Sequence, residues 1–167
     1  VEEILKLRNP VEKFAQLAAH PHPQAQFLWS IFRDVFHYCA VHLGDIADSA
    51  RDIDLAMRWG FGWAQGPFET WQAAGWRAVA EMIRDDIAHG RAMSAVPLPA
   101  WVFERDGVHA PAGSYSAAED SLKPRSALPV YQRQLYPDRV LGEAPDDRGE
   151  TLWENAGVRL WRRADQD

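Results

Sequence analysis

The stretch from Arg51 to Trp76, R-D-I-D-L-A-M-R-W-G-F-G-W-A-Q-G-P-F-E-T-W-Q-A-A-G-W, decides the fold. Its first part has the spacing of an amphipathic helix, which Gly60 and Gly62 are predicted to end because glycine readily adopts positive φ. Gly66-Pro67 then begins a second helix, since proline suits the first helical position, and Gly75 ends it. The sequence therefore predicts two short helices joined by a tight glycine turn.

We expect structural roles for the residues that define this motif. The two aspartates are predicted in the first turn of their helix, where acidic groups favour the positive end of the helix dipole. Asp54 is also placed to accept backbone N–H groups of the glycine turn. None of these roles demands catalysis. The motif residues are Asp52, Asp54, Gly60, Gly62, Gly66, Pro67, Phe68 and Gly75.

Helices are predicted on both sides of the motif. Asn9-Pro10 begins one that ends near Ala19, and amphipathic helices follow the motif from Arg77 to His89 and from Pro99 to Glu104. The main helix runs from Gln24 to about Asp45. It has two apolar stripes, which predict burial on more than one side, at the centre of the fold or in a subunit interface. The stripes consist of Phe27, Ile31, Val35, Tyr38, His42 and Ile46, and of Leu28, Phe32, Phe36, Cys39 and Leu43.

These patterns predict an all-α fold followed by a largely irregular tail. Residues 1–22 form a lead-in segment with a short helix, and residues 23–105 form the helical domain. Residues 106–149 contain Gly and Pro at short intervals, which predicts a linker that packs in patches. Around residues 155–157 the apolar residues alternate, which predicts a terminal β-hairpin. A lone hairpin is marginal in water, so we expect residues 150–167 to begin a truncated downstream domain. The linker's contact patches are expected at Tyr115, Leu128, Tyr131 and Leu135.

Composition and charge disfavour several classes of protein. The 167 residues carry a formal charge of −6, whereas nucleic acids select a basic surface. No apolar run approaches the ~20 residues that cross a bilayer, and no signal peptide is visible, so we expect a cytoplasmic protein. Cys39 is the single cysteine and is expected to be a small buried apolar residue. Eight Trp residues predict large aromatic contacts in a core or an interface.

The histidines invite a metal site, either His20 with His22, or His37 and His42 with Asp45. His37 and His42 are spaced so that they lie on different faces of a helix. A zinc site needs four well-placed ligands, or three and a water molecule. We therefore expect no metal.

Carboxylates, serines and basic residues have spacings that favour ordinary surface roles. The carboxylate pairs are predicted at polar helix ends, where solvated acids lie. The serines lack the Gly-x-Ser-x-Gly setting of a hydrolase. The basic residues of the tail either reach phosphate groups of a ligand on a neighbouring domain or are solvated. These residues are Asp45 with Asp48, Asp85 with Asp86, Ser94, Ser114 and Ser116, and Lys123, Arg125, Arg133 and Arg139.

The motif resembles the signature of the helical C-terminal domain of 3-hydroxyacyl-CoA dehydrogenases. The similarity is carried by Asp52-Ile53-Asp54-x-Ala56, Gly60-x-Gly62 and Gly66-Pro67-Phe68, and it extends from about Gln24 to Ala95. That family oxidises the 3-hydroxyl of fatty acyl-CoA with NAD in β-oxidation. Trp59, Trp63 and Trp71 make this variant similar to the second copy of the domain in bacterial proteins, some of which continue into an enoyl-CoA hydratase domain. The resemblance implies an all-helical bundle that serves subunit contacts and walls one side of the acyl-CoA cleft.

The resemblance places no catalytic residue in this chain. The family's active-site Asn would fall at about Trp29-Ser30, and NAD would bind to a domain outside this chain. We therefore expect a non-catalytic segment of a larger dehydrogenase, and the start at Val1 rather than Met is a further hint of this. The expected partners are an NAD-binding domain, a downstream hydratase domain, the acyl-CoA substrate of the parent protein and a second copy of the chain. The alternative is a free-standing helical dimerisation or interaction module with no acyl-CoA role.

Overall fold

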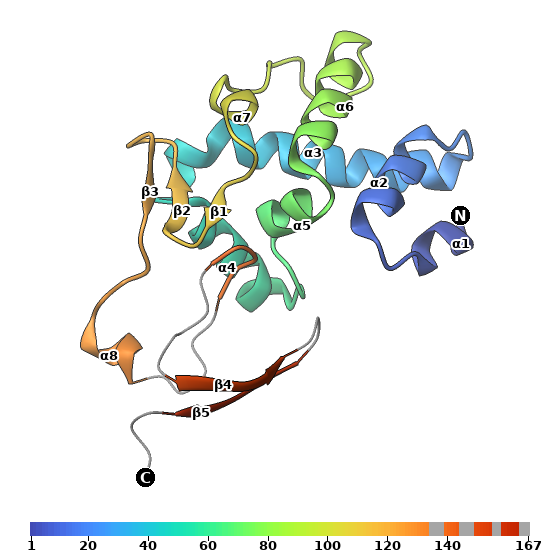
Figure 1. Cartoon of the computed structure of the whole chain (residues 1–167). Coiled ribbons are helices and arrows are strands. Elements are labelled where there is room, and N and C mark those ends of the chain that lie inside the picture. Colours follow the sequence, from blue (N-terminus) through green and yellow to red (C-terminus); the bar gives the residue numbers. More distant parts are fainter. Residues whose placement is uncertain (134–138, 144–148, 155–157, 164–167) are drawn as a thin grey trace.

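The computed structural model describes residues 1–133, 139–143, 149–154 and 158–163 (Figure 1). Helices form most of the described part. The helices are α1 (Glu2–Lys6), α2 (Pro10–Ala19), α3 (Pro23–Ile46), α4 (Ala50–Phe61), α5 (Pro67–Ala73), α6 (Trp76–Ala88), α7 (Trp101–Glu104) and α8 (Pro129–Gln132). The strands are β1 (His109–Ala110), β2 (Gly113–Ser116), β3 (Ser121–Lys123), β4 (Gly149–Glu154) and β5 (Arg159–Arg163). They form two small antiparallel sheets that follow α7 in the sequence, with the short α8 between them.

The helix starts follow the capping signals of the sequence. The side chain of Asn9 accepts a hydrogen bond from the backbone N–H of Val11 at 3.0 Å, and Pro10 is the first residue of α2. α3 begins in the same way after His22, whose Nδ1 accepts from the N–H of Gln24 at 3.2 Å. The predicted bounds of α2, α3, α5 and α6 are confirmed to within one or two residues. The lead-in residues before Asn9 form α1, which packs on α2 through the buried Ile4.

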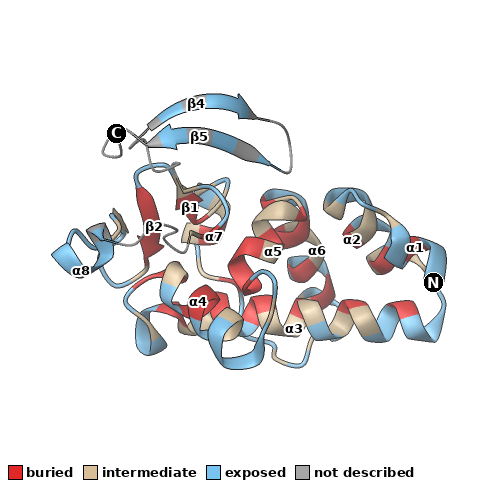
Figure 2. Cartoon of the chain, turned by 90° about the horizontal axis from the view of Figure 1, so that it is seen from below, coloured by how far each residue is buried: buried red, intermediate tan, exposed pale blue. Residues whose placement is uncertain are grey.

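The long helix α3 is the base of the helical layer, and only one of its two apolar stripes is covered by the described residues (Figure 2). Phe36 and Leu43 are fully buried, and they face the core with Cys39. Phe27, Ile31, Tyr38 and Ile46 of the other stripe are exposed. The alternative that α3 is central to the fold of this chain is therefore wrong, and the alternative that it forms half of a subunit interface stays a prediction.

Stacked aromatic rings form the centre of the core. Trp71 of α5 lies between Phe36 of α3 and Trp76 of α6, with ring centroids 5.5 and 4.1 Å away. The stack continues from Trp76 to Trp101 and from Trp101 to Tyr115, which joins the helices to the first sheet. The buried indole N–H groups of Trp71 and Trp76 donate to backbone carbonyls at 3.0 and 2.8 Å, so the rings bury a large apolar area and leave no unpaired donor of their own.

The prediction of an irregular tail from residue 106 is wrong for residues 109–123. These residues form a three-stranded antiparallel sheet in the order β1-β2-β3, with Tyr115 opposite Leu122. The sheet packs on α4, and every residue of β2 is buried. The fold is therefore mostly helical rather than all-α. Strands this short and rich in small polar residues lack the apolar alternation by which a strand is recognised.

The terminal hairpin is confirmed. β4 pairs antiparallel with β5, and Glu150 lies opposite Arg162. In Figures 1 and 2 the hairpin lies apart from the helices. The side chains of Leu128 and Tyr131, which were expected to pack, are exposed, and Leu135 lies outside the described residues. The view of residues 150–167 as the start of a further domain stays a prediction.

Candidate functional site

The glycine motif is centred on the buried carboxylate of Asp54. Its Oδ1 accepts from the backbone N–H of Phe68 at 2.8 Å and its Oδ2 from that of Glu69 at 3.0 Å, so Asp54 on α4 caps the start of α5. These N–H groups have no partner within their own helix, and a side-chain oxygen is the usual solution. A Cβ atom on Gly66 would overlap the Cα of Asp54. The close approach of the two helices therefore requires glycine at position 66.

The remaining motif residues shape the ends of the helices. Asp52 accepts from the N–H and Oγ of Ser49 at 2.9 and 2.8 Å, a capping contact at the start of α4. Gly62 ends α4 with a φ of 70°, whereas Gly60 lies within the last turn of the helix. The expectation of positive φ at both glycines is therefore wrong for Gly60. Gly75 separates α5 from α6 with a φ of 94°.

A buried chain of polar side chains extends from Asp54 into the sheet, and sequence reasoning did not find it. The Nε2 of His109 on β1 lies 2.6 Å from Asp54 Oδ2, and its Nδ1 lies 2.8 Å from the Oγ of Ser114 on β2. An ionised carboxylate only accepts hydrogen bonds, so His109 Nε2 donates to Asp54, and in the neutral imidazole Nδ1 then accepts from the hydroxyl of Ser114. Burial raises the pKa of Asp54 above its ordinary value, although the hydrogen bonds from His109 and from the Phe68 N–H oppose the shift.

This Asp-His-Ser chain has the residue types of a hydrolase triad, but a substrate would have no access to its serine. The side chain of Ser114 is 1 % exposed, and Asp54 is fully buried. Neither cleft described below is lined by Asp54, His109 or Ser114. A nucleophile must reach a substrate, whereas this hydroxyl is enclosed. The chain of hydrogen bonds therefore joins the sheet to the motif and does not form a reaction centre. No signal in the sequence near residue 109 pointed to this pairing.

Gln72 and Glu69 of α5 make further bonds to segments distant in sequence. The amide of Gln72 accepts from the N–H groups of Val108 and His109 at 2.9 and 3.0 Å and donates to the carbonyl of His109 at 2.9 Å. Glu69 accepts from the N–H of Gly66 at 2.8 Å and from that of Leu141 at 2.9 Å. The start of α5 is thus the point at which α4, the first sheet and residues 139–143 meet.

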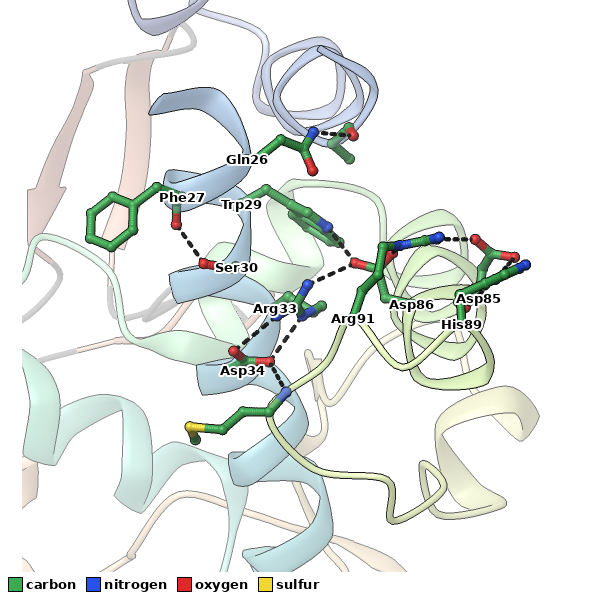
Figure 3. A network of polar contacts seen from close by, with 12 residues as sticks. Gln26, Phe27, Trp29, Ser30, Arg33, Asp34, Asp85, Asp86, His89 and Arg91 are labelled. Atoms are coloured by element: carbon green, nitrogen blue, oxygen red, sulfur yellow. Dashed lines mark hydrogen bonds and ion pairs between the residues drawn. The ribbon is translucent and has the colours of Figure 1, made fainter. Parts of the chain in front are cut away.

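The carboxylate pair Asp85–Asp86 lies in an ion network between α3 and α6 (Figure 3). Asp86 accepts from Trp29 Nε1 at 2.8 Å, from Arg33 Nη1 at 3.0 Å and from Arg91 Nε at 2.7 Å. Burial by itself would raise the pKa of Asp86, but the hydrogen bonds from Arg91, Trp29 and Arg33 outweigh it, and the pKa is lowered. The carboxylate therefore stays ionised and ties the two helices together. The positions where the family's Asn was sought hold Trp29, a member of this network, and Ser30, which donates to a backbone carbonyl of α3.

The histidines that invited a metal site make local structural contacts, and His20 Nδ1 accepts from the backbone N–H of His22 at 3.1 Å. His22 caps α3, His37 Nε2 lies 2.7 Å from the carbonyl of Val96, and His42 lies 3.6 Å from Asp45. Among the residues whose positions are described, no group of three or more His, Cys, Asp or Glu side chains is arranged to hold a metal ion. None of the helices in the described part of the chain is long and apolar enough to cross a lipid bilayer.

Clefts border the helices in the described part of the chain, and two of them are lined by candidate residues. One of about 480 Å³ lies between α4 and residues 123–131 and is lined among others by Arg51, Trp59, Lys123, Arg125 and Tyr131. Lys123 is paired with Glu119 at 2.8 Å, and Arg125 Nε lies 3.5 Å from Glu143, so these cations already have acidic partners. The other cleft, of about 110 Å³, lies between α3 and residues 93–96. Ser94 lines this second cleft, while Ser116 is fully buried in β2.

The chain is similar over 79 residues to a protein of Bacillus subtilis (strain 168) named probable 3-hydroxyacyl-CoA dehydrogenase, with 39% identity. The matched region covers 47% of this chain but 9% of that protein, so the chain spans less than a tenth of its relative. No protein-family profile matches the chain, and no solved structure matches it. The similarity supports a relation to the 3-hydroxyacyl-CoA dehydrogenases over about half of the chain.

Proposed function

We propose that this chain is a non-catalytic helical segment of a bacterial 3-hydroxyacyl-CoA dehydrogenase. The complete protein would transfer hydride from the 3-hydroxyl carbon of an acyl-CoA to NAD in fatty acid β-oxidation. The segment would supply packing, contacts between domains or subunits, and one face of the substrate cleft. The observation that carries the proposal is the 39% identity over 79 residues with a protein named as a probable member of that family.

The bonds of the motif support the non-catalytic part of the proposal. Both carboxylate oxygens of Asp54 accept hydrogen bonds from backbone N–H groups, and one of them also contacts His109. The carboxylate of Asp52 accepts a hydrogen bond from Ser49. Gly66 serves the close approach of α5 to α4, and Phe68 is fully buried. A site for NAD would lie in another domain, and an enoyl-CoA hydratase domain would follow in the proteins that carry one. These two parts of the proposal rest on the sequence resemblance.

An activity assay tests the proposal. This chain and the full-length gene product are each mixed with 3-hydroxybutyryl-CoA and NAD, and the absorbance of NADH is followed. We expect turnover by the full-length protein and none by this chain, whose folding is checked by circular dichroism. Turnover by this chain would contradict its non-catalytic role. Absence of turnover by the full-length protein would contradict the dehydrogenase assignment.

The second candidate is a dimerisation module, and the exposed stripe of α3 favours it. Phe27 and Tyr38 are 64% and 54% exposed, and Met93 and Val96, which line a cleft with Tyr38, are exposed as well. Tyr38, Met93 and Val96 also line the smaller cleft, so the apolar surface continues from the helix to the neighbouring segment. A large exposed apolar patch is typical of a surface that binds another protein. A second copy of the chain is the occupant we propose for this candidate.

Sedimentation equilibrium tests this second candidate. We expect a dimer for the wild-type chain and a monomer for Phe27→Glu and for Tyr38→Glu, because a carboxylate in the stripe would be desolvated without a partner. Leu5→Glu is the matched control, since Leu5 is exposed on α1 and lies outside the stripe. A wild-type chain that stays monomeric at every concentration would exclude the dimer.

A further inference from the structure

Residues 139–143, Arg-Val-Leu-Gly-Glu, form a short segment that is itself neither helix nor strand. They lie against α4 and α5, between two stretches drawn as grey traces (Figure 1). We refer to residues 139–143 as the docked segment. The segment follows β3 and α8 in the sequence, yet its contacts are mainly with α4, α5 and β1, besides one with Arg125.

The contacts of the docked segment are those of a bound peptide. Its backbone donates from the N–H of Leu141 to Glu69 Oε1 at 2.9 Å, and the carbonyl of Arg139 accepts from Arg58 Nη1 at 2.6 Å. The side chain of Val140 is 3% exposed and is the apolar anchor. Main-chain bonds combined with one buried side chain are the usual way in which a surface binds an extended peptide.

Two residues of the docked segment add specificity. A Cβ atom at Gly142 would lie 2.6 Å from the carbonyl oxygen of His109 and 3.0 Å from Gln72 Nε2, and its φ is 89°. Only glycine therefore fits at this position without a shift of the backbone. The carboxylate of Glu143 is buried, pairs with Arg51 and lies 3.5 Å from Arg125 Nε. The surface thus selects an apolar residue, a glycine and a carboxylate in a fixed order.

The receiving surface is complete without the docked segment. Arg58 lies 3.7 Å from Glu69, and Gln72 is held by the backbone of Val108 and His109, so the groups that bind the segment are already positioned by α4, α5 and β1. By contrast, the segment has one deeply buried apolar side chain, Val140, and one buried carboxylate, Glu143, while ordering five residues has a large entropic cost. Segments with few buried apolar contacts open before the rest of a protein unfolds.

We propose that the docked segment is a peptide ligand held in cis on a recognition surface formed by Arg51, Arg58, Glu69, Gln72 and His109. The segment leaves and returns while the helical body stays folded. When it is away, the surface takes another segment of the same chemistry: an apolar residue, a glycine two positions later and a carboxylate directly after the glycine. This inference is independent of the dehydrogenase assignment.

Amide hydrogen exchange of the full chain tests the release. We expect the N–H of Leu141 to exchange at least tenfold faster than the N–H of Glu69, because the segment opens while the helical body stays folded. Glu143→Gln should raise the exchange rate of Leu141 a further tenfold and leave Glu69 unchanged. Glu150→Gln is the control, since it removes an exposed carboxylate of the hairpin. Equal protection of Leu141 and Glu69 in the wild-type chain would overturn the proposal without any variant.

Binding in trans tests the recognition. The peptide acetyl-Arg-Val-Leu-Gly-Glu-amide is titrated into the full chain carrying Val140→Asp, and the side-chain N–H signals of Arg58 and Gln72 are followed by NMR. We expect binding at least tenfold tighter than to the wild-type chain, in which the tethered segment competes at high effective concentration. The peptide with Ala in place of Gly should not bind, because its methyl group meets the carbonyl of His109.

Three outcomes would contradict the recognition surface or its occupant. The Gly peptide failing to bind the folded Val140→Asp chain would exclude a recognition surface, and equal binding of the Ala peptide would exclude the role of Gly142. A dimer of the wild-type chain that Glu143→Gln dissociates would show that the segment docks on a second copy instead of in cis.

Discussion

Gly66 lies so close to the backbone of Asp54 that a Cβ atom there would overlap the Cα, Cβ and Oδ1 of the aspartate. The same aspartate caps the helix that Gly66 begins, through the N–H groups of Phe68 and Glu69. Gly66 is therefore needed for the close approach of α5 to α4. Asp54 then makes the hydrogen bonds to the start of α5 that this approach allows. Together they fix the crossing of α4 and α5.

Gly66→Ala should lower the free energy of unfolding by roughly 3 kcal/mol, because backbone rather than a flexible side chain blocks the added methyl group. Urea denaturation followed by tryptophan fluorescence measures the change. Gly60→Ala is the matched control. Gly60 lies inside α4 with no atom within 4 Å of an added Cβ, so this variant should be more stable by up to about 1 kcal/mol. Equal stability of the two variants would contradict the close approach.

Gly62→Val should cost about 1–3 kcal/mol, since a β-branched residue is strained at the φ of 70° that ends α4. The added side chain meets no atom within 4 Å, so the cost is one of backbone conformation alone. Gly62→Asn should cost less, because asparagine tolerates the left-handed region. A melting temperature that does not change in the Val variant would show that the turn does not need positive φ.

His109→Phe should destabilise the chain by about 2–4 kcal/mol, because it leaves the buried carboxylate of Asp54 without one of its donors. Chemical denaturation of His109→Phe, Ser114→Ala and the double variant measures the coupling. Ser114→Ala should cost about 1 kcal/mol, since the imidazole loses a partner but no charge is exposed. Additive effects of the two substitutions would contradict the continuous hydrogen-bond chain.

Asp86→Asn should remove a stabilisation that depends on pH. The folded pKa of Asp86 is lowered, so its contribution is present above the unfolded value of about 3.9 and is lost as the pH falls through the folded pKa. The stability difference between the wild type and Asp86→Asn should therefore be largest near neutral pH and should disappear at acid pH. Thermal melts from neutral to acid pH measure it, with the exposed Asp106→Asn as control. A difference that does not change with pH would contradict the ionised network.

Cys39 should react slowly with a disulfide reagent at mildly alkaline pH. The thiol is 6% exposed, and burial raises its pKa to about 12, with the charge of Asp54 adding to the shift. Very little thiolate is therefore present in the folded chain. We expect the reaction rate to rise to that of a free cysteine in denaturant. Fast labelling of the native protein would show that the helix around Cys39 opens without global unfolding.

Local chemistry in the sequence was sufficient to place α2 to α7, whereas α1 and α8 were not predicted. Asn9-Pro10 and Gly66-Pro67 mark helix starts because the cap and the proline act within one turn, and the structure has α2 and α5 beginning at these prolines. Gly60 and Gly62 have the same residue type but different conformations. The sequence did not distinguish them because either glycine is able to end a helix.

The partners of Asp54 were only half predictable. The backbone N–H groups lie within the motif, and the sequence indicated that they would be bonded. His109 lies far along the chain in a two-residue strand, and nothing in its neighbours marks it as the partner of a buried carboxylate. The same holds for Glu69 and Leu141, whose bond joins a helix to residues predicted as a linker.

By itself the sequence determined the helical framework, the glycine motif and the terminal hairpin, because capping, proline geometry and apolar periodicity act over a few neighbouring residues. Only the tertiary structure decided that residues 109–123 form a sheet, that His109 completes the surroundings of Asp54, and that one stripe of α3 stays exposed. Those outcomes depend on which surfaces pack together. The packing of the whole chain decides which distant residues meet, and no local sequence pattern records it.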